Sequence, residues 1–404
     1  MDITKTNVLQ VQTNNLGFQL IKRPIIAGIM VAMNLLQGTF TEEVQLHGQE
    51  HLLEENGKPR PGPYLWLSKH EVSADVINFV PYWMDIDLSL RFDLRGAMRN
   101  FKKSEYGFRA LDAAVLRHFT YHVSRTSRGE GNSTEEIELL RAENEQHFRQ
   151  VRENYGNGIH AVMFPEGTTQ TDGTVFPIKA GCYNIAKIER EDRSIDVITT
   201  IPIGLTYDHV SGDQDFFFQR IQRKHAFINM GKPFYYKPLP RREDETDESY
   251  VKADIANHTH RVREHLIGLN TFTVAQLAGE YVLRSGEAGR GEVSKDELED
   301  ILSERVERLQ RLPQTTFDYQ LENGYGRHNR IEQFWDGLER RGYIDNDGRL
   351  NFKKTLLVPG LKHYKRDNAL RYCVNRVRQL GEYRDDVRSV LETTSEEMLK
   401  RARR

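Results

Sequence analysis

The chain of 404 residues contains only two cysteines, Cys182 and Cys373, and neither lies in a Cys-x-x-Cys or similar ligand spacing. This scarcity argues against a structural zinc site and favours a reduced, intracellular setting. The first residues lack a basic stretch followed by an apolar core, so we expect no signal peptide. No Gly-x-Ser-x-Gly sequence occurs, which leaves the chain without that type of serine nucleophile.

Long apolar runs are also missing. The nearest candidate covers residues 24–36, which is too short, because a membrane-spanning helix needs about 20 apolar residues. Lys22 and Arg23 stand directly before this run. A helix lying in the headgroup region of a membrane and a helix packed on the protein core both fit the pattern. We therefore expect an N-terminal apolar helix within residues 1–40 and leave its environment open between these two.

The chain as a whole has little excess of positive or negative charge. Charged residues make up 29% of the sequence and the formal net charge is −2, so bulk charge does not predict a polyanion-binding protein. The distribution is uneven, because the part from Arg349 onward carries about +8. Such a basic end suits anionic lipid headgroups or nucleic acid, and it also suits a solvated helical face.

What the sequence does contain is an alternation of strand-like and helix-like segments up to about residue 270. This order predicts an α/β fold with a mixed, mostly parallel sheet flanked by helices. Beyond Asn270 amphipathic helices dominate, and Ser294 with Glu297 forms a capping box. We expect a core over residues 41–270 and a helical domain over residues 271–404. The expected strands cover residues 43–51, 64–67, 120–124, 160–164, 198–205 and 226–230, and the main helices cover 109–119, 133–155, 180–188, 249–269 and 294–312.

The most informative segment is residues 160–169, His-Ala-Val-Met-Phe-Pro-Glu-Gly-Thr-Thr. An apolar strand stops at Pro165, and a carboxylate, a glycine and two hydroxyls follow in one turn. Proline removes a backbone donor, whereas glycine permits positive φ and close approach of a ligand. A strand that ends in such a turn places polar groups at its carboxyl end, where α/β folds usually hold ligands.

A second candidate pair lies upstream, where Asp75 follows His70 by five positions. Transfer of an acyl group to a hydroxyl needs a base, because a free alcohol is a weak nucleophile. The unperturbed pKa of histidine, about 6.5, suits this task. Positions i and i+5 lie about 140° apart on a helix, so we expect His70 in the turn before a helix. The spacing alone is a weak signal.

Together and in this order, four segments resemble the motifs of the glycerolipid acyltransferase family. They are the His70–Asp75 pair, a block that ends in Arg125, the Phe-Pro-Glu-Gly-Thr turn, and Ile201-Pro202-Ile203-Gly204. The resemblance implies a glycerol-3-phosphate acyltransferase-like core over residues 41–270. It also implies a peripheral enzyme at the inner, cytoplasmic face of a membrane, with acyl-CoA or acyl-ACP as donor and neither metal nor cofactor.

The resemblance assigns a role to each matching residue. His70 would be the catalytic base and Asp75 would orient it, while Arg125 would hold the acceptor's phosphate. Glu166 would bind a hydroxyl or arrange the acceptor. The remaining substrate-binding candidates are Phe164, Gly167 and Thr168 in the turn, Lys179 as an added positive charge, and Pro202 in the wall around the acyl donor.

The identity of the acceptor stays open. Residues 271–298 and 362–372 resemble the helical extension of glycerol-3-phosphate acyltransferases, whereas the Phe-Pro-Glu-Gly-Thr form is typical of lysophosphatidate acyltransferases. Another lysolipid or a non-glycerolipid hydroxyl is one alternative, and a catalytically inactive lipid-binding protein is another. Residues 329–353 also predict a helix followed by a hairpin, a shape found in winged helices that bind nucleic acid. We expect no nucleic-acid partner.

Overall fold

The structure is a computed structural model, and it describes residues 41–56, 63–70, 94–99, 120–123, 133–156, 160–167, 172–187, 198–211, 224–360 and 367–402. The expected N-terminal apolar helix within residues 1–40 lies outside the described residues, as does the helix expected over 109–119. Among the described helices, none is long and apolar enough to cross a membrane.

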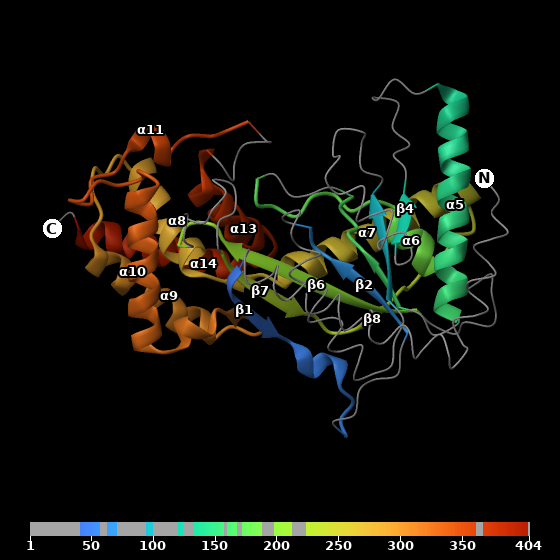
Figure 1. Cartoon of the computed structure of the whole chain (residues 1–404), viewed down its shortest axis with the longest axis horizontal. Helices are drawn as coiled ribbons and strands as arrows, with labels where there is room; N and C mark the ends of the chain where they lie inside the picture. The colour runs from blue at the N-terminus through green and yellow to red at the C-terminus, as the bar shows by residue number, and fades with distance from the viewer. Residues whose placement is uncertain are drawn as a thin grey trace, which may run out of the picture.

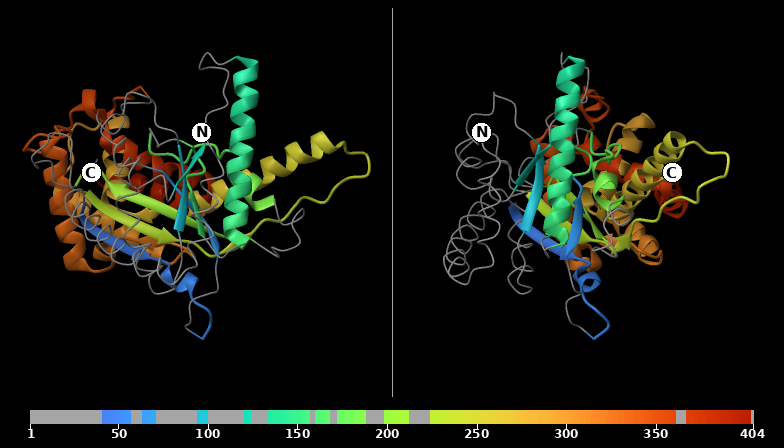
Figure 2. Two further views of the ribbon diagram at one scale, coloured as in Figure 1. Left: turned by 45° about the vertical axis from the view of Figure 1, so that its right-hand side comes forward. Right: turned by 90° about the vertical axis from the view of Figure 1, so that its right-hand side faces the viewer.

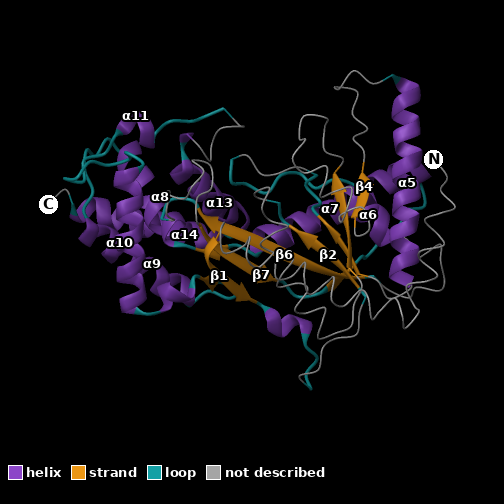
Figure 3. Ribbon diagram, in the orientation of Figure 1, coloured by secondary structure: helices purple, strands orange, loops and turns teal. Residues whose placement is uncertain are grey.

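A mixed eight-stranded sheet forms the centre of the fold, in the order β1-β7-β6-β2-β5-β3-β4 with β8 beside β6 (Figure 3). The strands are β1 (Thr41–His47), β2 (Tyr64–Ser68), β3 (Leu94–Arg99), β4 (Thr120–Val123), β5 (His160–Met163), β6 (Thr199–Asp208), β7 (Lys224–Met230) and β8 (Phe234–Tyr235). Among the described strands of this sheet, the pairings of β6 with β7 and with β8 are antiparallel and the others are parallel. The predicted mixed, mostly parallel sheet is therefore confirmed.

Helices follow and interrupt these strands, and they dominate the chain after residue 246 (Figure 1). They are η1 (Gln49–Leu52), α5 (Thr134–Gly156), α6 (Gly181–Ala186), α7 (Asp247–Gly268), α8 (Val274–Glu287), α9 (Lys295–Gln310), η5 (Tyr319–Glu322), α10 (Gly324–Arg340), α11 (Phe352–Thr355), α13 (Ala369–Tyr383) and α14 (Asp385–Arg401). Two short strands, β9 (Thr271–Phe272) and β10 (Thr316–Phe317), pair in parallel. The predicted capping box at Ser294 is present at the start of α9.

One predicted strand is too long. The sequence pattern extends it over residues 43–51, but β1 ends at His47 and a 3-10 helix follows. Gly48 causes the break, because its φ of +74° is a left-handed conformation that favours glycine. A Cβ at Gly48 would also lie 2.0 Å from the carbonyl oxygen of Met230. The hairpin expected after α10 is present as a single antiparallel bridge between Ile344 and Leu350.

The two faces of the sheet carry separate apolar clusters. Leu65 and Leu67 of β2 pack with residues of α5, α7 and α8, whereas Tyr64 and Trp66 belong to the cluster on the opposite face. All four side chains are at most 2% exposed. A parallel strand buried on both faces reads as a continuous apolar run, which is why Tyr-Leu-Trp-Leu shows no alternation. Figure 2 shows α7 on one side of the twisted sheet.

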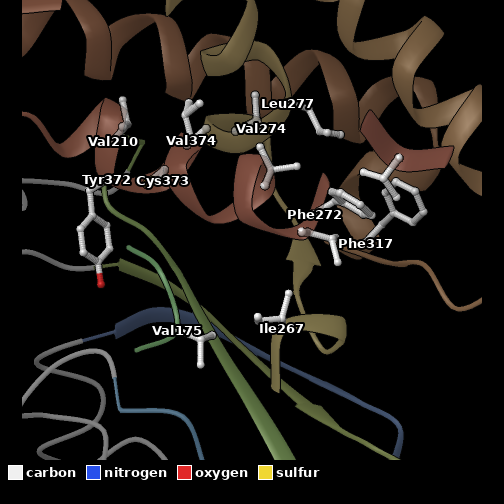
Figure 4. Packing of buried hydrophobic residues seen from close by; sticks show 14 of the residues in the cluster. Val175, Val210, Ile267, Phe272, Val274, Leu277, Phe317, Tyr372, Cys373 and Val374 are labelled. Carbon is white, nitrogen blue, oxygen red and sulfur yellow. The ribbon is translucent and has the colours of Figure 1, made fainter. Parts of the chain in front are cut away.

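The core on the helical face continues from the sheet into the C-terminal helices. Val175 and Ile267 pack in the same cluster as Phe272, Val274 and Val374, which come from β9, α8 and α13 (Figure 4). The cluster crosses residue 270, so the two predicted domains share buried contacts. The predicted boundary itself stays a prediction.

Buried ionic contacts also join the helices to the edge of the sheet. Arg330 of α10 donates from Nε to Asp318 Oδ2 over 2.6 Å and from Nη2 to Glu43 Oε2 of β1 over 2.6 Å. Gln45 of β1 donates to Asp318 Oδ1 over 2.7 Å. Arg330 and Asp318 are almost completely buried, so removing either side chain would take a close ionic partner from the other. These contacts fix α10 against β1.

Two buried histidines predict a loss of stability in mild acid. Burial lowers the pKa of His47 and of His258 to about 4. The unfolded chain, with histidine pKa values near 6.5, therefore binds more protons than the folded chain between about pH 4 and 6.5. The free energy of unfolding should fall as the pH drops through this window, by about 3 kcal/mol for each residue at most. Urea unfolding of wild type and of His258→Phe at pH 7.5 and 5 measures it. An equal pH dependence for both proteins would contradict this account.

Candidate functional site

The first and third of the four candidate motifs follow neighbouring parallel strands. His70 lies two residues after the end of β2, and the Phe-Pro-Glu-Gly turn comes directly after β5. Leu67 of β2 lies opposite Met163 of β5 in the register, so His70 and Glu166 stand at equivalent positions, three residues further along. Parallel strands place their carboxyl ends at the same edge of a sheet, where α/β folds usually hold ligands.

His70 contacts this turn through both its backbone and its ring. Its backbone N–H donates to Glu166 Oε1 over 3.1 Å. Its imidazole lies on the ring of Phe164, with 4.4 Å between the ring centroids and 32° between the planes. His70 is partly exposed, whereas its neighbour Lys69 is 2% exposed. The structure thus brings together the histidine and the glutamate-bearing turn that the sequence predicted as parts of one site.

The turn itself is closed by short local bonds. The N–H of Gly167 donates to the carbonyl oxygen of Phe164 over 3.0 Å, and Gly167 has a φ of +67°, a conformation that favours glycine. The carbonyl oxygen of Pro165 accepts from the N–H of Lys179 over 2.8 Å. Gly167 is exposed and Glu166 is 1% exposed, so the turn presents its glycine outward and its carboxylate inward.

Glu166 braces two loops. Its Oε1 accepts from the N–H of His70, and its Oε2 accepts from the N–H of Phe176 over 2.8 Å. Hydrogen bonds to a buried carboxylate are among the stronger ones in proteins, so this side chain holds the loop after β2 against the loop after β5. The sequence assigned Glu166 to the acceptor, and that role stays a prediction. Its bracing role was not foreseen.

Replacing Glu166 with glutamine should destabilise the protein. A glutamine side chain has one acceptor oxygen and one NH₂ group, so one of the two backbone donors would face another donor. An unsatisfied buried donor costs about 1–3 kcal/mol. We expect a loss of this size in the free energy of unfolding by urea for Glu166→Gln, and almost none for the exposed control Glu243→Gln. Equal unfolding curves for the two variants would show that the bonds contribute nothing.

The loop that contains Phe176 is held by side chains from two distant helices. Gln379 of α13 accepts from the N–H of Val175 over 2.8 Å and donates to its carbonyl oxygen over 3.1 Å. Arg263 of α7 donates to the same carbonyl oxygen over 3.1 Å. Asn375 of α13 donates to the carbonyl oxygen of Asp172 over 2.9 Å. Sequence reasoning missed these three side chains, because nothing local marks a polar residue that reaches a loop 88 to 204 residues away.

The fourth motif lies in the strand next to His70. Pro202 of β6 is opposite Leu67 of β2 and is buried, and its carbonyl oxygen accepts from the N–H of Gly231 over 2.9 Å. Lys179 is exposed, and its Cγ would lie 3.4 Å from a Cβ at Gly167. The other predicted site residues, Asp75, Arg125 and Thr168, lie outside the described residues, so their roles stay predictions.

Nucleophilic cysteine chemistry finds little support near the turn. Cys182 of α6 is fully buried, and burial raises the pKa of its thiol to about 12, so it stays protonated at neutral pH. Within the part of the chain that the structure describes, no group of three or more His, Cys, Asp or Glu side chains is placed to hold a metal ion. A partly exposed imidazole beside a rigid turn suits proton transfer to and from a bound substrate.

Comparisons with known proteins add little to this geometry. No family model matches the chain, and no curated protein matches it. Among solved structures, it is similar to the 1-acyl-sn-glycerophosphate (LPA) acyltransferase PlsC from Thermotoga maritima, with 14% sequence identity and a TM-score of 0.37. The match covers 65% of this chain and 88% of that chain. A likeness this weak carries no functional argument. The function is therefore inferred from the residues at the carboxyl ends of β2 and β5.

Proposed function

We propose that this protein is an O-acyltransferase that moves a fatty acyl group from a thioester to the hydroxyl of a phosphate-bearing glycerol acceptor. One observation carries the proposal: His70 lies in contact with Phe164 and Glu166 at the carboxyl ends of adjacent parallel strands. The motifs that contain these residues resemble those of glycerolipid acyltransferases in sequence and in order.

In the proposed reaction His70 acts as general base. Its imidazole takes the proton of the acceptor hydroxyl as the oxygen attacks the thioester carbonyl carbon. The tetrahedral intermediate then collapses, the carbon–sulfur bond breaks, and the imidazolium returns its proton to the leaving thiolate. The product is an ester and a free thiol. The contact with Phe164 holds the imidazole plane, while the bond from the backbone of His70 to Glu166 fixes the position of the residue.

The other assignments complete the proposed site. Asp75 orients the imidazole, Arg125 holds the acceptor's phosphate, Gly167 and Thr168 arrange the acceptor, and Glu166 positions His70 through its backbone. The donor is acyl-CoA or acyl-ACP, and the acceptor is glycerol-3-phosphate or lysophosphatidate. Lysophosphatidate and the acylated products carry fatty chains that partition into membranes, so we place the protein at the inner face of a membrane with no nucleic-acid partner. The core over residues 41–270 holds the site.

An acyl-transfer assay with a panel of acceptors tests the proposal. Wild-type protein is incubated with a radiolabelled acyl thioester and one of four acceptors, namely glycerol-3-phosphate, lysophosphatidate, another lysophospholipid, or glycerol without phosphate. We expect an acylated product from at least one of the first two and none from glycerol, because only the phosphate offers a partner for the predicted arginine. Transfer to another lysolipid alone would shift the substrate class. Absence of transfer to every acceptor would favour a catalytically inactive lipid-binding protein.

A further inference from the structure

An exposed apolar and basic edge stands out on the C-terminal helices. Phe352 in α11 is 39% exposed, and Leu357 and Val358 in the following turn are 40% and 65% exposed. Lys353 is exposed beside them, and Lys354 is partly buried. We call residues 352–358 the α11 edge. Figure 1 shows α11 and the stretch after it at the upper edge of the molecule.

The inward-facing residues of the same segment anchor it firmly. Thr355 is fully buried and donates from its hydroxyl to the carbonyl oxygen of Tyr343 over 3.3 Å. Leu356 packs toward α8, where its Cδ2 would lie 3.2 Å from a Cβ at Gly286. The side chain of Asn368 donates to the carbonyl oxygens of residues 354, 355 and 357 over 2.8–3.2 Å. The outward apolar side chains therefore belong to a fixed segment.

Charge along this segment has one sign. From Gly348 to Gly360 the chain carries Arg349, Lys353 and Lys354 and no acidic residue, and Arg349 is paired with Asp347 over 3.8 Å. Burial lowers the pKa of Lys354 and the neighbouring charge of Arg341 lowers it further, whereas Asp367 raises it. Apolar side chains rimmed by lysine match the interface of an anionic bilayer. The apolar side chains would contact the acyl chains, and the lysines would contact the headgroups.

The α11 edge is also linked to the candidate functional site. Asn368, which holds the edge, caps the N-terminus of α13. A few residues along α13, the carbonyl oxygen of Tyr372 lies only 1.9 Å from the position that a Cβ at Gly173 would take, so the two backbones are in close contact. Gly173 belongs to the loop that Asn375 and Gln379 hold and that bonds to Glu166 through Phe176. The α11 edge is thus connected through α13 to the candidate functional site.

We propose that the α11 edge is a docking surface for an anionic lipid bilayer, with Phe352, Leu357 and Val358 inserted and Lys353 and Lys354 at the headgroups. The inference stands on exposure, anchoring and charge. It does not require that the acyl-transfer proposal be correct. Membrane contact by residues 1–40 would be a separate contact, and the test below separates the two.

Vesicle binding by the full chain tests the surface. Sedimentation with phosphatidylglycerol vesicles should bind wild type, and a Leu357→Asp/Val358→Asp variant should bind about tenfold more weakly. Lys353→Glu should weaken binding to these vesicles and leave binding to neutral phosphatidylcholine vesicles unchanged. Tyr325→Asp, at a side chain of α10 that is 80% exposed, is the matched control and should bind like wild type. Unchanged binding by the double variant would overturn the proposal and leave residues 1–40 as the membrane contact.

A position-specific reporter covers the case in which the double variant fails to fold. An environment-sensitive dye at Val358→Cys should show a blue-shifted emission with anionic vesicles, whereas the same dye at Tyr325→Cys should not. Cys182 and Cys373 are buried and should stay unlabelled. No shift at position 358 with vesicles would overturn the proposal. A shift that instead follows protein concentration without vesicles would also overturn it, because a second copy of the chain would then cover the edge.

Discussion

His70→Ala is expected to lower the rate of acyl transfer by about 10³-fold while leaving the fold intact, because general-base catalysis contributes roughly 10²–10⁴-fold. The side chain of His70 is partly exposed, and its structural bond to Glu166 comes from the backbone N–H, which alanine keeps. The loss should therefore appear in kcat and not in the free energy of unfolding.

The matched control for this variant is His260→Ala. His260 is an exposed histidine on α7 whose ring contacts Glu264 over 3.2 Å. It should transfer acyl groups at the wild-type rate. Initial rates of thiol release with a saturating acceptor measure both variants. Near-normal turnover by His70→Ala would remove this residue from the chemistry, even if the protein proved to be an acyltransferase.

Arg305→Met should cause a loss of about 4 kcal/mol in the free energy of unfolding, because it leaves buried acceptors without a donor and removes one cationic partner of the buried Glu280, which keeps its ion pair with Arg284. Arg305 of α9 is completely buried and donates to Glu280 Oε2 over 2.6 Å. It also donates to Thr394 Oγ1 over 2.9 Å and to the carbonyl oxygen of Leu391 over 2.8 Å. One guanidinium thus holds α8, α9 and α14 together.

A double-mutant cycle separates the ion pair from the packing. Glu280 is buried like Arg305, so Arg305→Met/Glu280→Leu removes both charges and should recover part of the loss of the single variant. Arg311→Met, at an exposed arginine directly after α9, should change the unfolding curve little. Strictly additive effects of the two core substitutions would mean that this pair does not couple.

The strands that carry the site could be predicted because their patterns are local. The apolar run Tyr64–Ser68 and the run His160–Met163 each end in polar residues, and both were predicted as strands that deliver candidate side chains. The order of the motifs predicted that His70 and Glu166 would share one site, and the structure places them in contact. The local pattern was sufficient here because β2 and β5 pair in parallel, so that the residues after their carboxyl ends lie at the same edge of the sheet.

Long-range contacts could not be predicted from the sequence. Glu166 was read as a substrate ligand, whereas its carboxylate oxygens accept from the backbones of His70 and Phe176. Whether this carboxylate binds a ligand or a backbone N–H depends on how the loops after β2 and β5 are placed relative to each other. Gln379 is one of several polar and charged residues on α13, so nothing marked it as the partner of Val175. Such partners depend on how α13 packs, which no local pattern specifies.

The most direct test of the central claim is a double-mutant cycle on kcat/KM with His70→Ala and Glu166→Gln, at a temperature where both variants are folded. If Glu166 acts by holding His70 in place, its substitution matters only while the imidazole is present. The double variant should then be about as slow as His70→Ala alone. Losses that multiply in the double variant would show that the two side chains act independently and would contradict a single catalytic unit at the ends of β2 and β5.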